Sequence, residues 1–236
     1  MDQHSFGRLR AIGRFFLDSV FPQFCIGCNR EGVTICRACC VPATERVSWY
    51  CPVCMAARAQ MGKCDACIGD LDALGAIASH HNPLVRKAVH DVKFGFREEV
   101  AIVLGRRLGE LLRGAGLPDA LAVVPVPLSK RRMITRDFNQ SALIVRGMLE
   151  SVEQPHWQVH SGLIVRTRST RAQATLDGRD ARFQNVAGAF AVTVALSGTV
   201  LLIDDVATTG ATLQACAAAL RAAGAQRVIA AVIAHG

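Results

Sequence analysis

The chain has 236 residues, of which 51% are hydrophobic and 19% are charged, and its formal net charge is +8. This composition supplies enough apolar side chains for one sizeable domain and a smaller one, and it excludes a wholly disordered protein. No apolar run reaches the ~18 residues that a membrane span needs, so the sequence also predicts no membrane-spanning helix.

The first 22 residues combine apolar and basic side chains at helical spacing. Apolar side chains recur every three or four residues between Phe6 and Val20, and three arginines interrupt them. These arginines break the continuous apolar stretch of a signal peptide. We expect an amphipathic helix over residues 1–22 that packs on the rest of the protein, and a helix lying on a membrane surface is the alternative.

Ten cysteines are present, and eight of them form four C-x-x-C pairs. The spacings C-x2-C-x7-C-x2-C and C-x2-C-x9-C-x2-C present two sets of four thiolates suited to tetrahedral Zn²⁺. We therefore expect a double zinc-ribbon module over residues 23–70 with two structural zinc ions, closed sequentially, although spacing alone also permits interleaved closure. Iron–sulfur ligation and disulfides are the alternatives, and the missing signal peptide disfavours disulfides. The predicted metal ligands are Cys25, Cys28, Cys36, Cys39, Cys51, Cys54, Cys64 and Cys67.

Strands and helices alternate through residues 71–236, which we expect to form one α/β domain. Such alternation predicts a mostly parallel sheet with flanking helices, and ligands on such sheets bind beyond the carboxyl ends of the strands. Pattern and flanking turn residues predict strands at Ala73–Ser79, Leu121–Val124, Trp157–Arg166, Ala189–Val194, Val200–Ile203 and Arg227–Ile233, and helices at Leu84–Phe94, Arg97–Arg113, Phe138–Val152 and Thr212–Ala223.

The strand Val200–Ile203 runs directly into two carboxylates, Asp204 and Asp205. Two carboxylates at the end of a strand can accept hydrogen bonds from vicinal hydroxyls or hold Mg²⁺. The backbone N–H groups and hydroxyls that follow can surround a phosphate, assisted by the helix dipole, whereas an ordinary helix N-cap is the alternative. We call this segment the phosphate loop, and its residues are Val206, Ala207, Thr208, Thr209, Gly210, Ala211 and Thr212.

Basic side chains concentrate between Leu128 and Arg182. This span holds ten lysines and arginines against five acidic residues. Such a surface suits polyanions, either pyrophosphate or nucleic acid, and a solvated basic face is the alternative.

The order of these motifs resembles the ComF (ComFC) family, a competence-associated group of type I phosphoribosyltransferase-like proteins. The resemblance covers about Cys25 to Ile233. It depends on the cysteine pairs, on Pro-Val-Pro-Leu at 125–128, on Arg-Asp-Phe-Asn-Gln at 136–140, and on the phosphoribosyl pyrophosphate (PRPP) signature at the phosphate loop. The family usually has Gly where Asp137 stands, which suggests a left-handed backbone there.

This resemblance implies binding of Mg²⁺ with PRPP, or of ribose 5-phosphate, together with a cytoplasmic location and a role in DNA uptake or processing. It also implies competence or DNA-processing proteins as partners, while ribbons and basic surface are expected to contact single-stranded DNA. Asp204 and Asp205 would hold the ribose hydroxyls, directly or around Mg²⁺, as the catalytic pair, and the phosphate loop would hold the 5′-phosphate. The other implied PRPP-binding residues are Val126, Pro127, Lys130, Arg136, Asn139, Gln140, Arg168 and Arg171, the last two on a flap over residues 166–173.

Two other functions remain open at this point. The protein could be an active phosphoribosyltransferase in nucleotide metabolism or salvage, or a regulator that senses PRPP without turnover.

Overall fold

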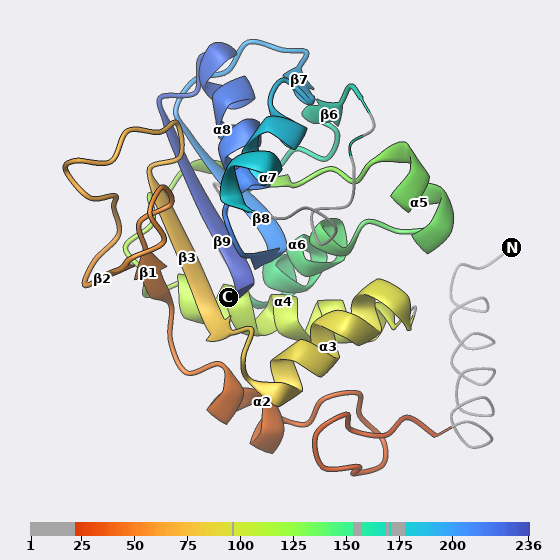
Figure 1. Cartoon of the computed structure of the whole chain (residues 1–236). Coiled ribbons are helices and arrows are strands. Elements are labelled where there is room, and N and C mark those ends of the chain that lie inside the picture. Colours follow the sequence, from red (N-terminus) through yellow and green to blue (C-terminus); the bar gives the residue numbers. More distant parts are fainter. Residues whose placement is uncertain (1–21, 96, 153–156, 169, 171–177) are drawn as a thin grey trace, which may run out of the picture. The chain divides into compact units, whose positions relative to one another are not determined.

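The computed structural model describes residues 22–95, 97–152, 157–168, 170 and 178–236 (Figure 1). The helix expected over residues 1–22 lies outside this description, except for Pro22. The chain divides into two compact units, Met1–Pro42 and Ala43–Gly236, which are described separately. This boundary passes between the two predicted cysteine groups, so the joint module over residues 23–70 stays a prediction.

The described part of the first unit, from Pro22 to Pro42, contains the cysteine group Cys25, Cys28, Cys36 and Cys39. A turn carries Cys25 and Cys28, and a short helix, α2 (Arg37–Ala43), begins beside Cys36. The N–H of Ile26 donates to the carbonyl oxygen of Thr34 at 2.9 Å, which joins the two halves of the segment.

The second unit contains a seven-stranded sheet with the order β2-β1-β3-β9-β8-β4-β5. The five strands from β3 to β5 are parallel, and β1 and β2 extend the sheet in antiparallel fashion. This confirms the predicted mostly parallel sheet with flanking helices. The strands are β1 (Ser48–Tyr50), β2 (Ala57–Arg58), β3 (Ala73–Ser79), β4 (Leu121–Pro125), β5 (Trp157–Val159), β8 (Thr199–Ala207) and β9 (Arg227–His235).

Helices cover both faces of this sheet, because alternate side chains of the central strands are apolar on each face. Val200 and Leu202 of β8 pack with Leu213 and Leu220 of α8, and all four are fully buried. On this face α8 is accompanied by α7, whereas α4 and α6 lie on the other (Figure 1). No helix in the described parts has the length and apolar character to cross a bilayer. The helices of this unit are α3 (Pro83–Phe94), α4 (Glu98–Leu112), α5 (Lys130–Arg136), α6 (Gln140–Ser151), α7 (Arg179–Val186) and α8 (Ala211–Ala222).

The single strand predicted over Trp157–Arg166 is wrong. The chain turns at Gly162, whose φ is 88°, and continues as β6 (Ile164–Arg166). This strand pairs with β7 (Phe190–Val192), which lies within the predicted strand Ala189–Val194, in a separate two-stranded antiparallel sheet. The turn therefore moves half of the predicted strand to another sheet.

Two glycines bring α4 and α6 into close contact. A Cβ atom on Gly105 would lie 2.2 Å from the carbonyl oxygen of Ile144, and one on Gly147 would lie 2.1 Å from that of Ile102. Real Cβ atoms do not approach this closely, so the two helices can pack in this way only with glycine at both positions. The packing fixes the first turn of α6, which reaches the carboxyl end of β8.

Candidate functional site

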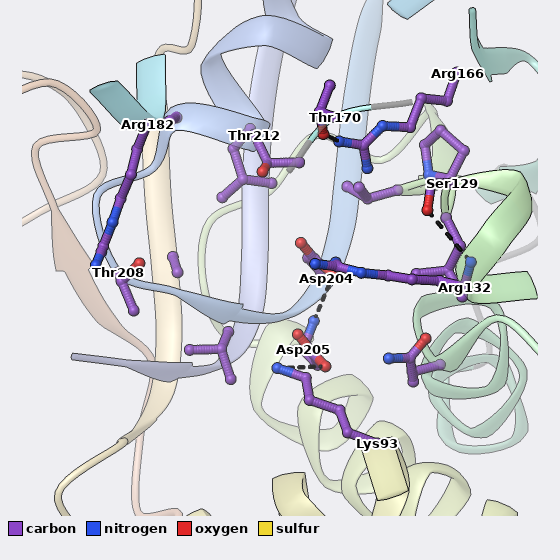
Figure 2. A pocket seen from close by; sticks show the side chains of 18 of the residues that line it. Lys93, Ser129, Arg132, Arg166, Thr170, Arg182, Asp204, Asp205, Thr208 and Thr212 are labelled. Atoms are coloured by element: carbon purple, nitrogen blue, oxygen red, sulfur yellow. Dashed lines mark hydrogen bonds and ion pairs between the residues drawn. The ribbon is translucent and has the colours of Figure 1, made fainter. Parts of the chain in front are cut away.

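A cleft of about 1060 Å³ opens beyond the carboxyl ends of β4 and β8 (Figure 2). Parallel sheets place their ligands at this edge, because the strand ends and helix amino ends meet there. The cleft contains Asp204, Asp205 and the whole phosphate loop, and Figure 2 shows them facing basic side chains from α3, α5, β6 and α7.

The two aspartates have different partners. Asp204 Oδ1 accepts hydrogen bonds from Ser141 Oγ and from the backbone N–H of Asp205, both at 2.9 Å. Asp205 Oδ2 forms an ion pair with Lys93 Nζ at 3.1 Å. The protein thus supplies one carboxylate held by neutral donors and one held by a cation.

Burial and repulsion from Asp205 raise the pKa of Asp204 to about 7, although the Ser141 hydrogen bond opposes this rise. A carboxyl group of this kind ionises readily when a cation arrives nearby. Asp204 is therefore suited to change its charge on binding Mg²⁺ or another positively charged group.

The phosphate loop leads into the amino end of α8. Gly210 takes the left-handed conformation there, with a φ of 72°, and within the described parts of the chain no side-chain cap is found at this end of the helix. Uncapped N–H groups at a helix amino end, together with the helix dipole, favour an anion. Thr208, Thr209 and Thr212 add hydroxyl groups along the same wall of the cleft.

The opposite wall is cationic. Burial and the neighbouring Arg132 lower the pKa of Arg136 and of Arg166 below the ordinary arginine value. Such a shift reports that these cations are partly buried and also repelled by Arg132, and a bound polyanion would offset both costs. The cleft's basic residues are Lys93, Arg132, Arg136, Arg166 and Arg182.

Four buried polar atoms lack a hydrogen-bond partner among the described residues, namely Gln140 Oε1, Arg166 Nε, Asp205 Oδ2 and His235 Nε2. The first three belong to side chains that line the cleft, and Asp205 Oδ2 has its ion pair with Lys93. Buried donors and acceptors are normally satisfied, so the Gln140 and Arg166 atoms fit a polar ligand. The donor set of carboxylates, hydroxyls, amides and guanidinium groups agrees with magnesium and a sugar phosphate.

The structure brings most of the predicted ligand-binding residues together. Val126, Pro127, Arg136 and Gln140 line the cleft with the aspartates and the phosphate loop. Asn139 instead caps α6, accepting from the N–H of Ser141 at 3.0 Å, and donates to the carbonyl oxygen of Val126 at 3.1 Å.

Other predicted residues lie elsewhere or are not described. Arg168 donates to the carbonyl oxygen of Ala187 at 2.7 Å and is not among the described residues that line the cleft. The side chain of Lys130 and the whole of Arg171 lie outside the description. Asp137 has the left-handed conformation expected at a glycine position, with a φ of 62°, and it ends α5.

Three side chains near the aspartates had no predicted role, namely Lys93, Ser141 and Arg132. Lys93 and Arg132 line the cleft, and Ser141 donates to Asp204. Each lies on a separate helix, so no continuous motif joins them to the aspartates. Phe94 is 62% exposed at the cleft wall, with the Arg136 guanidinium 5.5 Å from its ring centroid.

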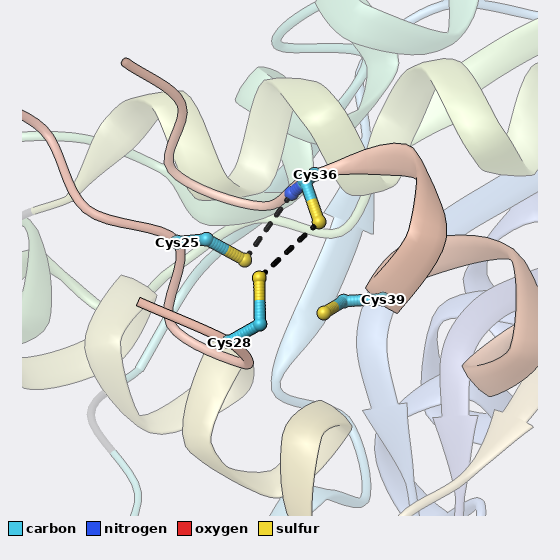
Figure 3. A group of neighbouring side chains, drawn as sticks. All are labelled: Cys25, Cys28, Cys36 and Cys39. Atoms are coloured by element: carbon cyan, nitrogen blue, oxygen red, sulfur yellow. Dashed lines mark hydrogen bonds between the residues drawn. The ribbon is translucent and has the colours of Figure 1, made fainter. Parts of the chain in front are cut away.

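The eight predicted metal ligands form two sets in sequential order, as expected. Cys25, Cys28, Cys36 and Cys39 make the first group, whose Sγ atoms all lie within 4.8 Å of one another (Figure 3). Cys51, Cys54, Cys64 and Cys67 make the second group with the same separation limit. None of the ten cysteines is in a disulfide.

The geometry of both groups fits one tetrahedral ion. Sγ atoms are 3.6 Å apart between Cys28 and Cys36, and 3.7 Å apart between Cys54 and Cys64. Four thiolates at the usual Zn–S length of about 2.3 Å would be separated by about 3.8 Å. The residues present therefore fit a structural zinc in each group.

The four thiols of each group cannot all ionise easily, because each thiolate repels the others. Burial alone would raise the pKa of Cys25 and of Cys51, but hydrogen bonds from backbone N–H groups lower both to about 6. Hydrogen bonding to Cys36 raises the pKa of Cys39 to about 12. Burial raises the pKa of Cys67 to about 12 as well. A divalent cation removes this conflict, because it stabilises all four thiolates together.

The fold and the cleft define a phosphoribosyltransferase-like protein with two four-cysteine metal groups. A model of the phosphoribosyl transferase domain family matches residues 192–236, which contain the aspartates, the phosphate loop and α8.

Relatives extend this assignment over most of the chain. DNA utilization protein YhgH of Escherichia coli (strain K12) is 31% identical over 225 residues, covering 92% of this chain and 89% of the relative. The protein of the same name from Salmonella typhi is 34% identical over 205 residues, covering 82% and 87%. Competence protein F of Haemophilus influenzae is 32% identical over 116 residues, 48% of each chain. The chain belongs to the ComF family.

Proposed function

We propose that this protein binds PRPP, or ribose 5-phosphate, with Mg²⁺ in the cleft and acts in DNA uptake or utilisation in the cytoplasm. The observation that carries the proposal is the pairing of Asp204 and Asp205 with the uncapped amino end of α8. Carboxylates suit the ribose hydroxyls or the metal, and the helix end suits the 5′-phosphate. The arginines opposite suit the pyrophosphate.

Calorimetry of Mg²⁺–PRPP binding tests this proposal. We expect binding by the wild-type protein and at least a tenfold loss of affinity in Asp204→Asn and in Asp205→Asn. Asp119→Asn is the matched control, because it removes the same charge from an exposed residue. Asp119 precedes β4 and so lies at the amino ends of the parallel strands, whereas the cleft lies at their carboxyl ends. Equal affinities in all four proteins, or no binding to the wild type, would contradict the proposal.

The DNA role is proposed from the names of the relatives together with the charge of the chain. Two of the relatives are named for DNA utilization and for competence. With a net charge of +8, phosphate contacts would dominate binding to single-stranded DNA. Trp49 contributes little to base stacking, because it is buried in β1 and its ring packs against Gly75.

Binding of a single-stranded oligonucleotide should therefore weaken steeply with salt. Each phosphate contact adds about 0.7 to the slope of log affinity against log salt. Absence of binding even at low ionic strength would remove the DNA half of the proposal and leave the cleft unaffected.

Phosphoribosyl transfer is the second candidate, and the exposed ring of Phe94 favours it. A planar nitrogen acceptor could stack on this ring beside the ribose site, while the arginines stabilise the departing pyrophosphate. Release of pyrophosphate from PRPP with a panel of bases or amines tests this activity. Silence across the panel would count against transfer and favour a PRPP-sensing role without turnover.

A further inference from the structure

The two metal groups contain one corresponding position with different residues. Asn29 follows Cys28 in the first group, and Met55 follows Cys54 in the second. Both take the left-handed conformation, with φ values of 60° and 64°, and both N–H groups donate to the carbonyl oxygen of the first cysteine at 2.9 Å. Asn tolerates this conformation well, whereas Met does so at a cost. The turn itself therefore gives no reason for Met.

The side chain of Met55 gives a reason, because it reaches the phosphate loop. A Cβ atom on Gly210 would lie only 2.3 Å from Met55 Cε, so the methyl group rests on the Gly210 backbone. Met55 is half-buried and packs against the main hydrophobic core. It is not among the described residues that line the cleft, so it contacts the loop from behind.

A second contact joins the same two segments. Gln214, in the first turn of α8, donates from Nε2 to the carbonyl oxygen of Pro52 at 3.1 Å. Its Oε1 accepts from the N–H of Leu71 at 3.3 Å. The side-chain amide of Gln214 thus contacts Pro52 and Leu71, which lie at the two ends of the segment that contains the second cysteine group. Gln214 itself follows closely after the phosphate loop.

We propose that the second cysteine group, with its metal bound, positions the phosphate loop through Met55 and Gln214, so that metal and sugar-phosphate binding strengthen each other. Met55 is a positioning residue that fixes Gly210 and the first N–H groups of α8. Coupling of this kind is reciprocal between two ligands. The identity of the sugar phosphate depends on the function proposed above, whereas the positioning of the loop does not.

Met55→Asn separates this role from ordinary stabilisation. The variant has the residue that the turn prefers but loses the apolar contact of Met55 with the core, so we expect unchanged zinc content and a thermal stability close to that of the wild type. We also expect Mg²⁺–PRPP to bind about 5- to 50-fold more weakly by calorimetry, within the usual range of site-to-site coupling. Asn29→Met is the matched control and should lose stability with unchanged affinity. Wild-type affinity in Met55→Asn would overturn the proposal.

Hydrogen exchange of the ligand-free protein tests the positioning without any ligand. Amides of residues 206–213 should exchange faster in Met55→Asn than in the wild type, and Met55→Leu should restore their protection. If the wild type does not bind Mg²⁺–PRPP, the proposed function fails, but this exchange still decides the positioning. Unchanged exchange in Met55→Asn would overturn it.

Discussion

The two cysteine groups have the same ligands and nearly the same geometry, but they belong to different structural contexts. The first group lies in the unit Met1–Pro42, whose described chain contains one short helix and an isolated bridge between Phe24 and Glu31. The second lies in the unit Ala43–Gly236, where its hairpin, β1 and β2, is part of the main sheet and Gln214 joins it to α8.

This difference indicates how identical metal chemistry could serve different purposes within one chain. A metal in the first group would organise its own segment. In the proposal above, a metal in the second group would also organise one wall of the cleft, because Met55 lies against Gly210 of the phosphate loop. The other wall has a different support, since α6 is fixed by glycine packing against α4 and presents Ser141 to Asp204.

Removal of the second metal should have the largest effect. Replacing Cys51 and Cys54 with Ser removes two ligands, and structural zinc contributes on the order of 10 kcal/mol to folding in small metal domains. We expect loss of one zinc, loss of Mg²⁺–PRPP binding and a lower melting temperature of the second unit.

The matched variant replaces Cys25 and Cys28 with Ser. It should also lose one zinc but keep the melting transition of the second unit, followed by near-UV circular dichroism of Trp49 and Trp157. If both double substitutions lowered the melting temperature of the second unit equally, the distinction between the two groups would be contradicted.

The wall of the cleft that α6 supports can be tested at Gly147. An Ala there would place its Cβ 2.1 Å from the carbonyl oxygen of Ile102, so α4 and α6 must separate. We expect a loss of about 3 kcal/mol in unfolding free energy with zinc content unchanged. Gly114→Ala is the control, because nothing lies within 4 Å of the added atom. A denaturant titration in which both variants match the wild type would refute the packing argument.

Asp204 should make the stability of the second unit depend on pH. Burial and repulsion from Asp205 raise its folded pKa from 3.8 to about 7, so the folded state holds the proton more tightly than the unfolded state. The unfolding free energy should therefore fall as pH rises from about 4 to 7, by at most about 1.4 kcal/mol per pH unit.

Asp204→Asn should remove this decrease without altering other titrations. Denaturant titrations at pH 4 should give similar stabilities for the two proteins, and at pH 8 the variant should be the more stable. A wild-type slope that persists unchanged in the variant would assign the pH dependence to other groups.

The expected change in zinc affinity is the smallest of these effects, but it tests the comparison between the two cysteine groups most specifically. In a chain with Cys25→Ser and Cys28→Ser, the remaining zinc reports on the second group alone. Saturating Mg²⁺–PRPP should raise its affinity about tenfold in competition with a chelator, because coupling between two ligands is reciprocal. Met55→Asn in the same chain should reduce this increase, and an increase that is unaffected by Met55→Asn would argue against coupling through the loop.

Much of the fold could be predicted because its signals are local. The apolar runs of β8 and β9 and the Pro at the start of α3 gave strands and a helix within a few residues of those observed. The cysteine spacing likewise gave both metal groups. The aspartates and the phosphate loop formed a continuous motif, so the centre of the site was recognisable.

The rest depends on contacts between distant parts of the chain. Strands of two or three residues, such as β2 and β6, carry too little periodicity to be read, and the left-handed turn at Gly162 splits one apparent strand. Nothing near Met55 in the sequence indicates Gly210. Lys93 and Ser141 reach the aspartates only through the packing of α3 and α6.

The most direct measurement is a crystal structure of the protein soaked with Mg²⁺ and PRPP. The account predicts a 5′-phosphate against the N–H groups at the start of α8, with pentose hydroxyls or the metal at Asp204 and Asp205. Ligand density at another surface, or an empty cleft at saturating concentration, would contradict it.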